Sequence, residues 1–486
     1  MFMTRLLPLV LALVVALTLA CSGGDPEPLA GTERSLAARD EATEVVETAP
    51  TVTLGATEIA TPNQQQAEAP TDAKAKEEAA PTRQAETVAV SEPTPTATGP
   101  TPAASATASC QLVRDAPGPP GEVELHVEVV VDGLEIPWGL AILPSGDMLV
   151  TERPGRLRLV RDGEVVPQPV LEFGVSMPPP LYGLDLLGSE GGLLGVLLHP
   201  EFADNRLFYL FYNIDNADGV QTGRIERYTL SGDGRSAALD RVILDNLPAG
   251  IHHQGGRMRL GPDGMLYVGV GAYEPHDAQD PDTLAGKLLR MDLEGGIPGD
   301  NPDPDSYVFA SGIRNTQGYD WYDEQHIVMV EHGPSGIELG RQDLRGYDEV
   351  NVVTAGDNLG WPRIWGCDEQ EGLVSPVLTW ENPVPPTGGM FYRSGLIPEW
   401  TGSFLFTTVG LDDRPGHGRH LHRVVFASMD PYTVLAHEVY LQDAYGRLRT
   451  VASDRHGRIY VMTSNCDNRG ECPTEGDKIL RIGPAR

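Results

Sequence analysis

The sequence predicts an all-β fold: a six-bladed β-propeller with four-stranded blades, preceded by a long disordered tether. Three observations support this prediction. A turn followed by a strand of alternating apolar residues recurs six times, at intervals of about sixty residues. No long segment after residue 117 shows the 3.6-residue apolar period of a helix. The preceding segment is rich in Ala, Thr, Pro, Glu and Gln and holds almost no aromatic residues.

The start of the chain predicts export. Arg5 precedes an apolar run, 6–19, that is too short to span a bilayer and fits the core of a secretory signal. Residues 18–20 lead directly into Cys21 and resemble a bacterial lipobox, in which the cysteine receives lipid. We therefore expect residues 1–20 to be a lipoprotein signal peptide and the protein to be extracytoplasmic, at the cell surface or in the periplasm. The lipid would be its only membrane contact. An ordinary signal peptide with an incidental cysteine is the alternative.

Residues 21–116 are expected to be a disordered linker, because they hold too little apolar surface to offset the entropy of an ordered chain. The whole chain has a formal net charge of −33. Such a charge argues against nucleic acid and anionic membrane surfaces as partners. It also supplies many carboxylates for divalent cations.

The five cysteines fit an exported protein. If Cys21 carries lipid, four remain, and an even number in an oxidising compartment suggests two disulfides. Cys466 and Cys472 flank a short loop and form the first predicted pair. Cys110 and Cys367 would then tie the linker to the folded domain. A zinc site is the alternative, but the spacing does not suit one.

Residues 117–486 are too long for an ordinary single core, and a repeat solves that problem. The repeated turns fall near Gly146, Asn205, Gly264, Glu324, Gly402 and Gly457. Six such units suit a six-bladed propeller with long loops. The final strand, 478–484, is expected to close the ring by pairing with an early strand at 123–131. A pair of β-sandwiches is the alternative, and it leaves the even spacing unexplained.

Two polar clusters precede or follow the repeated strands and suggest chemistry. His253 lies in the run IHHQGGR, where a histidine can act as a general base and the glycines let a ligand approach the backbone. A loop histidine bonded to backbone is the alternative. Arg314 and Asn315 stand side by side and offer several donors to a planar anionic ligand. The alternative for this cluster is a surface ion pair.

Two further clusters suggest ion binding. The segments 331–334, 348–351 and 356–362 combine carboxylates, Asn side chains and a Gly-Pro step, which are hard oxygen ligands suited to calcium. The alternative is a loop whose turns require Asp and Gly. Arg447 and Arg449 are two apart in a predicted strand and therefore point to the same face. They form either an anion site or an exposed basic strand.

Taken in order, these clusters resemble the soluble quinoprotein glucose dehydrogenase and aldose sugar dehydrogenase family. The resemblance runs from Leu134 to the C-terminus and includes LVTERPGRLRLV, HQGGRMRLGPDGMLYVGVG, RNTQG, EHGP, DEVN, DNLGWP and GRLR. It implies a six-bladed propeller that oxidises the C1 hydroxyl of an aldose, or a related alcohol, to the lactone. It further implies pyrroloquinoline quinone (PQQ) held by Ca²⁺ as cofactor, and a cytochrome or quinone as the external electron acceptor.

Carried over residue by residue, the resemblance gives each cluster a role. His253 would remove the hydroxyl proton while Arg314 and Asn315 bind the quinone oxygens. The other implied contacts are the carbonyls of Gly333 and Pro334 on the PQQ calcium, Arg447 and Arg449 on the PQQ carboxylates, Glu190 near the cofactor, and Glu349 with the Leu359 carbonyl on a second calcium.

The chain departs from the family pattern near the expected base. Ala272 replaces an aspartate that assists the catalytic histidine in relatives, and Glu274 or Asp277 are the nearby carboxylates that could substitute. Glu190 replaces a glutamine, and a carboxylate there would repel the cofactor unless calcium or an arginine intervenes.

Two further departures lie at the expected channel mouth. The cofactor-binding lysine of relatives has no clear match, although Arg414 or Arg419 lies nearby. Residues 335–347 form an insertion between EHGP and DEVN.

Three functions remain open at this point. The first is an active PQQ- and calcium-dependent sugar dehydrogenase. The second is a catalytically degenerate propeller that binds carbohydrate or a protein partner, a reading motivated by Ala272 and Glu190. The third is a calcium-dependent lactone hydrolase. The sequence carries no Ser-His-Asp signature, phosphate-binding loop or GxGxxG motif between a strand and a helix.

Overall fold

The computed structural model describes residues 110–114, 117–177, 189–336, 338–341, 344–410 and 418–485. The predicted signal peptide, the lipid on Cys21 and the linker up to residue 109 lie outside these ranges. Within them, no helix is long and apolar enough to cross a membrane.

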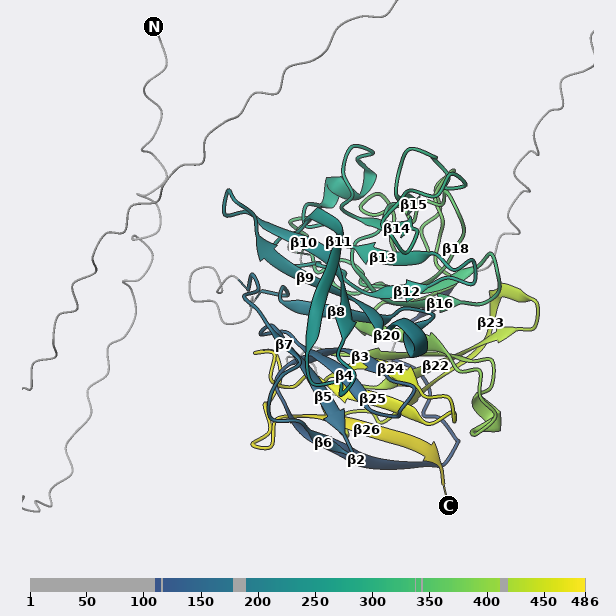
Figure 1. The fold of residues 1–486 in the computed structure, drawn as a ribbon. Coiled ribbons are helices and arrows are strands. Elements are labelled where there is room, and N and C mark those ends of the chain that lie inside the picture. The colour runs from purple at the N-terminus through teal and green to yellow at the C-terminus, as the bar shows by residue number, and fades with distance from the viewer. Residues whose placement is uncertain are drawn as a thin grey trace, which may run out of the picture. The chain divides into compact units, whose positions relative to one another are not determined.

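The described chain folds into six sheets, the blades of a propeller, and the consecutive strands of each blade pair antiparallel (Figure 1). The first strands are β3 (Pro137–Ile142), β8 (Leu193–Leu198), β12 (Met258–Leu260), β16 (Thr316–Trp321), β20 (Pro386–Phe391) and β24 (Leu448–Ser453). The second strands are β4 (Met148–Glu152), β9 (Leu207–Asp215), β13 (Leu266–Val270), β17 (Ile327–Glu331), β21 (Phe404–Thr408) and β25 (Ile459–Thr463).

The third strands are β5 (Arg156–Arg161), β10 (Gln221–Leu230), β14 (Lys287–Met291), β18 (Asp348–Val353), β22 (Leu421–Ala427) and β26 (Asp477–Pro484). The outer strands are β6 (Glu164–Val165), with β7 (Leu171–Glu172) also on β5, then β11 (Ala237–Pro248), β15 (Val308–Ala310), β19 (Leu378–Trp380), β23 (Asp430–Tyr440) and β2 (Leu125–Leu134). The described helices are short: α1 (Phe202–Asn205), η3 (Pro275–Gln279) and η4 (Pro398–Trp400).

The six repeated turns all lie between the first and the second strand of a blade, so the predicted repeat is the structural repeat. Glycine occupies four of these turns because the backbone there is left-handed, with φ of 95° at Gly146 and 76° at Gly264. At Asn205 the turn contains α1 instead. The prediction of six four-stranded blades is therefore confirmed.

The ring closes as the sequence predicted. The early strand β2 pairs antiparallel with the C-terminal β26, with Leu125 opposite Pro484 and Leu134 opposite Asp477. Figure 1 shows the two strands side by side, the N-terminal one blue and the C-terminal one yellow. The last blade thus joins both ends of the described domain, an arrangement that a pair of β-sandwiches does not have.

A segment before β2 runs along the outer edge of the ring. The strand β1 (Gln111–Val113) adds in parallel to β19, inside the region that composition assigns to the linker. The Trp380 indole N–H then donates to the Pro117 carbonyl at 2.6 Å, and Pro120 bridges to Val439 of β23. We call residues 110–114 and 117–121 the strap.

Both predicted disulfides are present. Cys110 pairs with Cys367 and pins the strap at a Cα–Cα distance of 5.5 Å. Cys466 pairs with Cys472 and closes a short loop between β25 and β26.

The core lies within and between the blades. Large side chains such as Trp380, Trp400 and Tyr319 are fully buried there. Burying one such side chain stabilises the fold by roughly 1.5–3 kcal/mol. The packed blades thereby hold the loops at their ends in fixed positions.

Candidate active site

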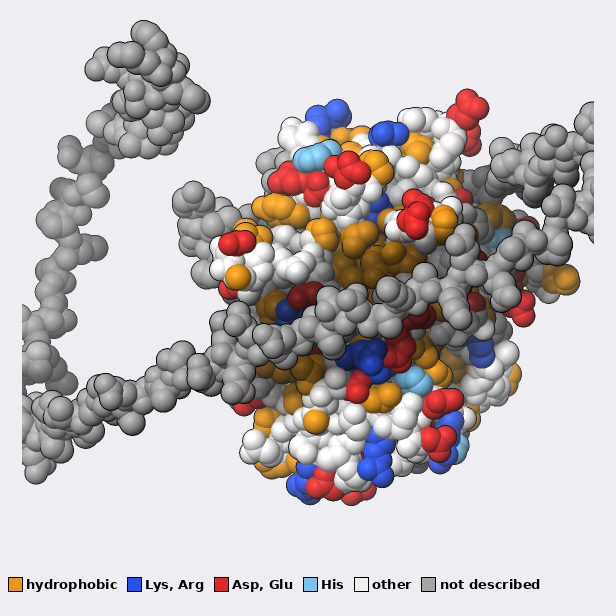
Figure 2. Space-filling model, turned by 45° about the horizontal axis from the view of Figure 1, so that its top comes forward, with side chains coloured by type: hydrophobic (Ala, Val, Ile, Leu, Met, Phe, Trp, Pro, Cys, Tyr) orange, Lys and Arg blue, Asp and Glu red, His pale blue; other side chains and the backbone are white. Residues whose placement is uncertain are grey.

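The candidate site lies at one end of the ring of first strands. In an antiparallel blade, the chain enters the first strand and leaves the second strand at the same end. Residues before a first strand and after a second strand therefore meet there. His253 precedes β12 and Ala272 follows β13, and the two are in direct contact. One face of the described domain shows acidic, basic and hydrophobic side chains gathered around its middle (Figure 2).

His253 is held in one orientation by two hydrogen bonds. Its backbone, at a left-handed φ of 61°, donates from N–H to Glu190 at 2.9 Å. Its Nδ1 lies 2.7 Å from the Ala272 carbonyl oxygen. Because a carbonyl only accepts, Nδ1 carries the proton and Nε2 keeps a lone pair. Burial and the nearby Arg314 lower the pKa of His253 to about 3, so the ring is neutral at neutral pH.

The Ala272 contact answers the first departure from the family pattern. The backbone carbonyl of Ala272 orients the imidazole, in the place where the sequence suggested a missing carboxylate. Neither Glu274 nor Asp277 provides the acceptor at Nδ1; both lie at the short helix η3. The structure therefore gives His253 an orienting acceptor although position 272 carries no carboxylate.

Glu190 does not stand as an uncompensated carboxylate. Its Oε1 accepts from Arg469 at 2.9 Å, and its Oε2 accepts the His253 N–H. Burial alone would raise the pKa of Glu190, but Arg469, His252 and His253 hold it well below its ordinary value. Arg469 therefore compensates the charge of Glu190, as the sequence analysis requires if an anionic cofactor is to bind nearby.

Glu190 lines a hollow with an excess of arginine, which we call the arginine hollow. Its charged lining residues are four arginines and two carboxylates: Arg153, Arg447, Arg449, Arg469, Glu190 and Asp467. Asp467 sits between Arg447 at 2.8 Å and Arg449 at 3.3 Å, all three being buried. Burial, with Arg447 and Arg153 close by, lowers the pKa of Arg449 to about 10. The hollow thus favours a ligand with negative charge.

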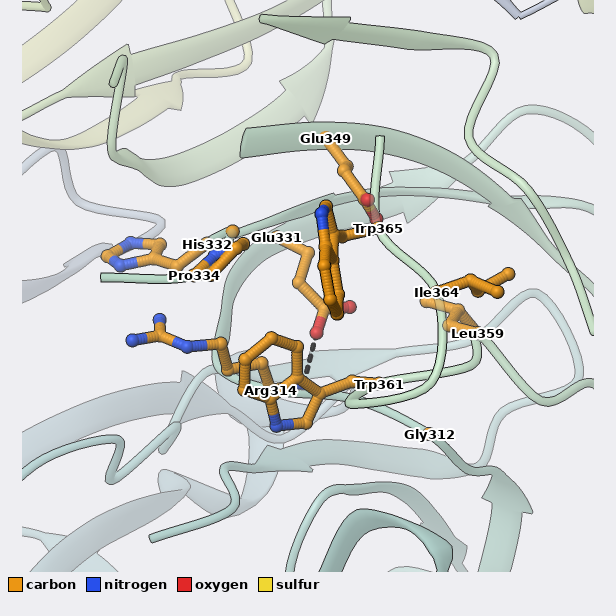
Figure 3. Close-up of a pocket in the computed structure, with 11 residues that line it drawn as sticks. Gly312, Arg314, Glu331, His332, Pro334, Glu349, Leu359, Trp361, Ile364 and Trp365 are labelled. Atoms are coloured by element: carbon orange, nitrogen blue, oxygen red, sulfur yellow. Dashed lines mark hydrogen bonds between the residues drawn. The ribbon is translucent and has the colours of Figure 1, made fainter. Parts of the chain in front are cut away.

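A second hollow adjoins the first, and His332 lines both. We call it the tryptophan hollow, because Trp361 and Trp365 line it (Figure 3). The Arg314 guanidinium lies 5.4 Å from the Trp361 ring and donates through Nε to Glu338 at 2.9 Å. Glu338 belongs to the inserted segment 335–347, so the insertion contacts Arg314, a residue expected to bind the cofactor.

The tryptophan hollow also contains a pair of buried carboxylates. Burial and the neighbouring Glu349 raise the pKa of Glu331 to about 8, and burial together with Asp348 and Asp368 raises the pKa of Glu349 to about 7. Glu331 Oε2 has no hydrogen-bond partner among the described residues, and neither does the buried Oδ1 of Asn351. Figure 3 shows both carboxylates beside Trp365.

The carbonyl-bearing residues predicted for calcium line the same hollow. Gly333, Pro334 and Leu359 all do so, together with Glu349. The Pro334 carbonyl already accepts from the Gly346 N–H at 3.1 Å and keeps a second lone pair. Across the described chain, no three His, Cys, Asp or Glu side chains gather in a metal-binding group. A cation here would therefore depend on carbonyl and carboxylate oxygens together, as calcium does.

The structure brings most of the predicted residues into the two hollows. Glu190, Arg447 and Arg449 line the arginine hollow, and the others line the tryptophan hollow: Arg314, Gly333, Pro334, Glu349 and Leu359. His253 and Asn315 line neither. They are bonded to the arginine hollow, His253 to Glu190 and Asn315 through its Oδ1 to the Gly255 N–H at 3.2 Å. Arg419 packs beside Gly410, whereas Arg414 lies outside the described ranges.

Sequence reasoning missed three charged residues of the site, Arg153, Asp467 and Arg469. Arg153 directly follows β4, so a search of the residues after each second strand would have found it. Asp467 and Arg469 lie inside the loop closed by Cys466 and Cys472, where the disulfide drew attention away from them.

Comparison with known proteins agrees with this geometry. Residues 134–472 match the model of the glucose/sorbosone dehydrogenase family. The aldose sugar dehydrogenase of Escherichia coli (strain K12) is 31% identical over 384 residues, covering 74% of this chain and 93% of that protein. Quinoprotein glucose dehydrogenase B of Acinetobacter calcoaceticus is 28% identical over 276 residues, covering 51% of this chain and 54% of that protein.

A solved structure shares both fold and sequence. The PQQ-bound aldose sugar dehydrogenase of Streptomyces coelicolor superimposes with a TM-score of 0.63 at 30% identity, covering 75% of this chain and 99% of that one. Together with the family match over residues 134–472, this supports an oxidoreductase of the sugar dehydrogenase type. The chain belongs to the glucose/sorbosone dehydrogenase family.

Proposed function

We propose that the protein is a PQQ- and calcium-dependent dehydrogenase that oxidises an aldose, or a related alcohol, at C1 to the lactone. Electrons would pass to an external acceptor, a cytochrome or a quinone. One observation carries the proposal: a neutral, oriented His253 stands beside a hollow lined by four arginines. A base next to a strongly cationic hollow suits a reaction on an anionic quinone.

The residues present fit PQQ, which is a planar tri-acid. Two buried donors at the site have no partner among the described residues: Arg449 Nε and Asn315 Nδ2. Unpaired buried donors are costly, and an anionic ligand would satisfy them. Arg447, Arg449 and Arg153 would face its carboxylates, and Arg314 with Asn315 would face the quinone oxygens.

The chemistry then divides between the cofactor and the chain. When bound, the quinone supplies the two-electron acceptor for the sugar's C1 hydrogen. Nε2 of His253 takes the hydroxyl proton, because Nδ1–H is committed to the Ala272 carbonyl. Arg314 places positive charge where an oxyanion develops, and its side chain is only 5% exposed, so water screens it weakly.

The tryptophan hollow fits calcium. Carbonyl oxygens of Gly333 and Pro334 would hold the ion nearest the quinone, and Glu349 with the Leu359 carbonyl would hold a second one. The unpartnered Glu331 and Asn351 oxygens supply further acceptors. A cation would also stabilise the charged forms of Glu331 and Glu349, whose pKa values are raised by burial and by neighbouring carboxylates.

The test is a titration of the protein with PQQ and Ca²⁺, followed by a panel of aldoses and a dye acceptor. We expect saturable PQQ binding, a change in the quinone absorbance on adding sugar, and dye reduction. His253→Asn should lower the rate of dye reduction at least about 10³-fold and leave the PQQ dissociation constant within about threefold of the wild-type value. Lactone formation is checked on the product. PQQ binding without turnover on any sugar would favour a degenerate, carbohydrate-binding propeller, and lactone hydrolysis without PQQ would favour the hydrolase.

Calcium is tested separately by thermal unfolding. Ca²⁺ should raise the melting temperature relative to a chelator-treated sample, and Glu349→Gln should reduce that rise. Equal melting temperatures with Ca²⁺ and with chelator would remove calcium from the proposal.

We also propose that the protein is a lipoprotein attached outside the cytoplasm through Cys21. The support is the apolar run 6–19, whose end, Thr18–Leu19, continues through Ala20 directly into Cys21. Labelled fatty acid should enter the wild type and not Cys21→Ser. An unlabelled wild type would leave a simple secreted protein.

A further inference from the structure

Glu190 and Arg469 connect two blades across the site. Glu190 lies in the loop before β8, and Arg469 lies in the loop between β25 and β26, separated by 279 positions in the chain. Their side chains are 23% and 31% exposed, so the pair is largely shielded from solvent. The same Glu190 carboxylate accepts the N–H of His253 through its other oxygen.

This geometry gives Glu190 two tasks. The bond to the His253 N–H helps hold a non-glycine residue at φ 61°, a backbone conformation that L residues rarely adopt. The bond to Arg469 balances the carboxylate charge. Without that balance, a negative charge would face the arginine hollow and weaken its attraction for an anion.

We propose that the Glu190–Arg469 ion pair is a positioning unit: it fixes His253 in its reactive orientation and keeps the Glu190 charge from opposing an anionic cofactor. This inference rests on the proposed function. Neither residue is assigned a step in the chemistry, because each acts through His253 or through the charge of the hollow.

The disulfide-closed loop gives the pair its anchor. Arg469 lies two residues after Asp467, whose carboxylate accepts from Arg447 Nη2 at 2.8 Å. Asp467 is an ionised carboxylate: burial would raise its pKa, but the three surrounding arginines hold that pKa below its ordinary value. Arg447, Asp467 and Arg469 therefore form one charged array in the arginine hollow, and Glu190 attaches it to the blade that begins with β8.

The experiment compares three variants with the wild type: Glu190→Gln, Arg469→Gln and the double variant. Arg469→Gln leaves an unbalanced carboxylate, and we expect its PQQ dissociation constant to rise about 10- to 100-fold. Glu190→Gln keeps an acceptor for the His253 N–H, and we expect a smaller loss. The double variant is neutral at both positions and should recover PQQ affinity to within a few fold of the wild type. Arg423→Gln, which breaks the Arg423–Glu438 pair in β22 and β23, is the matched control and should leave affinity unchanged.

The pH profile provides a readout that a purely structural role would not change. The titratable and charged groups that face Glu190 are Arg469, His252, His253, Arg153, Arg449 and His332. Removing Arg469 removes the nearest cation, so protonation of Glu190 should enter the accessible pH range and restore PQQ affinity as the pH falls. The double variant lacks the carboxylate and should show no such recovery.

A measurement on the protein without cofactor separates this inference from the proposed function. Nitrogen-15 spectra of the histidines report whether Nδ1 of His253 carries the proton, and both Arg469→Gln and a Glu190→Ala variant should broaden or shift that signal. If wild-type protein fails to bind PQQ, the proposed function fails, and these spectra still decide the positioning role. Unchanged spectra in both variants, or additive losses of affinity in the double variant, would overturn the pair as a unit.

Discussion

At the scale of single residues, the imidazole Nδ1 of the proposed base, His253, contacts a backbone carbonyl rather than a carboxylate. The Ala272 carbonyl accepts from His253 and fixes the ring, so the alanine side chain itself has no polar task. The side chain is 1% exposed and packs in a small apolar cluster with Ala278 and Trp361. An alanine at this position is therefore compatible with an oriented base.

This contact predicts the outcome of restoring the aspartate of relatives. Ala272→Asp would place a carboxylate in the apolar cluster, and we expect the free energy of unfolding to fall by about 2–4 kcal/mol. Turnover should not rise, because the Nδ1 acceptor is already present. Urea unfolding and steady-state rates check both points, with Ala272→Ser as the uncharged control. A tenfold gain in turnover would mean that orientation by the carbonyl is inadequate.

At the scale of elements, the two disulfides serve different parts of the molecule. Cys466–Cys472 closes a loop of six positions that carries Asp467 and Arg469 into the site. Cys110–Cys367 links positions 257 residues apart and holds the strap. Because cross-linking a long loop removes more chain entropy from the unfolded state, stability should depend mainly on the second bond.

Serine substitutions should separate these roles. Replacing Cys466 and Cys472 should weaken PQQ binding about tenfold and lower the free energy of unfolding by up to about 2 kcal/mol. Replacing Cys110 and Cys367 should cost up to about 5 kcal/mol and leave PQQ affinity unchanged. Calorimetry and PQQ titration of the two double variants make the comparison. The reverse pattern would show that the strap, and not the loop, supports the site.

At the scale of the whole molecule, buried histidines make the propeller acid-sensitive. His420 and His422 are fully buried in the blade of β20–β23, with His420 Nε2 at 3.0 Å from His422 Nδ1. His422 Nε2 lies 3.3 Å from His437 Nδ1. Burial, with His437 nearby, lowers the pKa of His420 to about 3, and burial holds the pKa of His422 well below its ordinary value. In mildly acidic solution, these histidines therefore bind protons in the unfolded chain but not in the folded one.

The sign of the pH effect follows from this difference. A histidine with a lowered pKa contributes stability that is complete above its ordinary value of 6.5 and is lost as the pH falls toward about 3. Each such histidine should cost about 1.4 kcal/mol per pH unit below pH 6. Urea unfolding between pH 7 and pH 4.5 measures the slope. His422→Phe should make it shallower, and the exposed His456→Asn should not; equal slopes in all three proteins would contradict the assignment.

Patterns along the chain were enough to predict the ring and much of the site. The turns near Gly146 and Gly457, and the closing strand 478–484, follow from patterns within short segments, and the structure has these elements where the patterns predict them. Partnerships between distant residues have no such signature. Arg469 lies far from Glu190 in the sequence. Neither segment alone could therefore show that an arginine compensates the Glu190 charge.

Local chemistry misled in the same way elsewhere. The orienting group for His253 is a backbone carbonyl, and every residue type carries one, so Ala272 suggested a defect that the fold removes. The strand β1 is only three residues long and sits in a polar segment, where composition favours a linker. Its strand character comes from pairing with β19, a tertiary contact.

The strap also determines how the domain would respond to tension. A pull on the chain before Cys110 reaches the covalent bond to Cys367 before it reaches β1, Pro117 or β2. Load then enters the blade of β16–β19 through the loop after β18, rather than through the N-terminal end of β2, which pairs with β26 to close the ring. In a single-molecule stretching experiment, reducing this disulfide should transfer the force to the closing strand pair and let the ring open at a lower force.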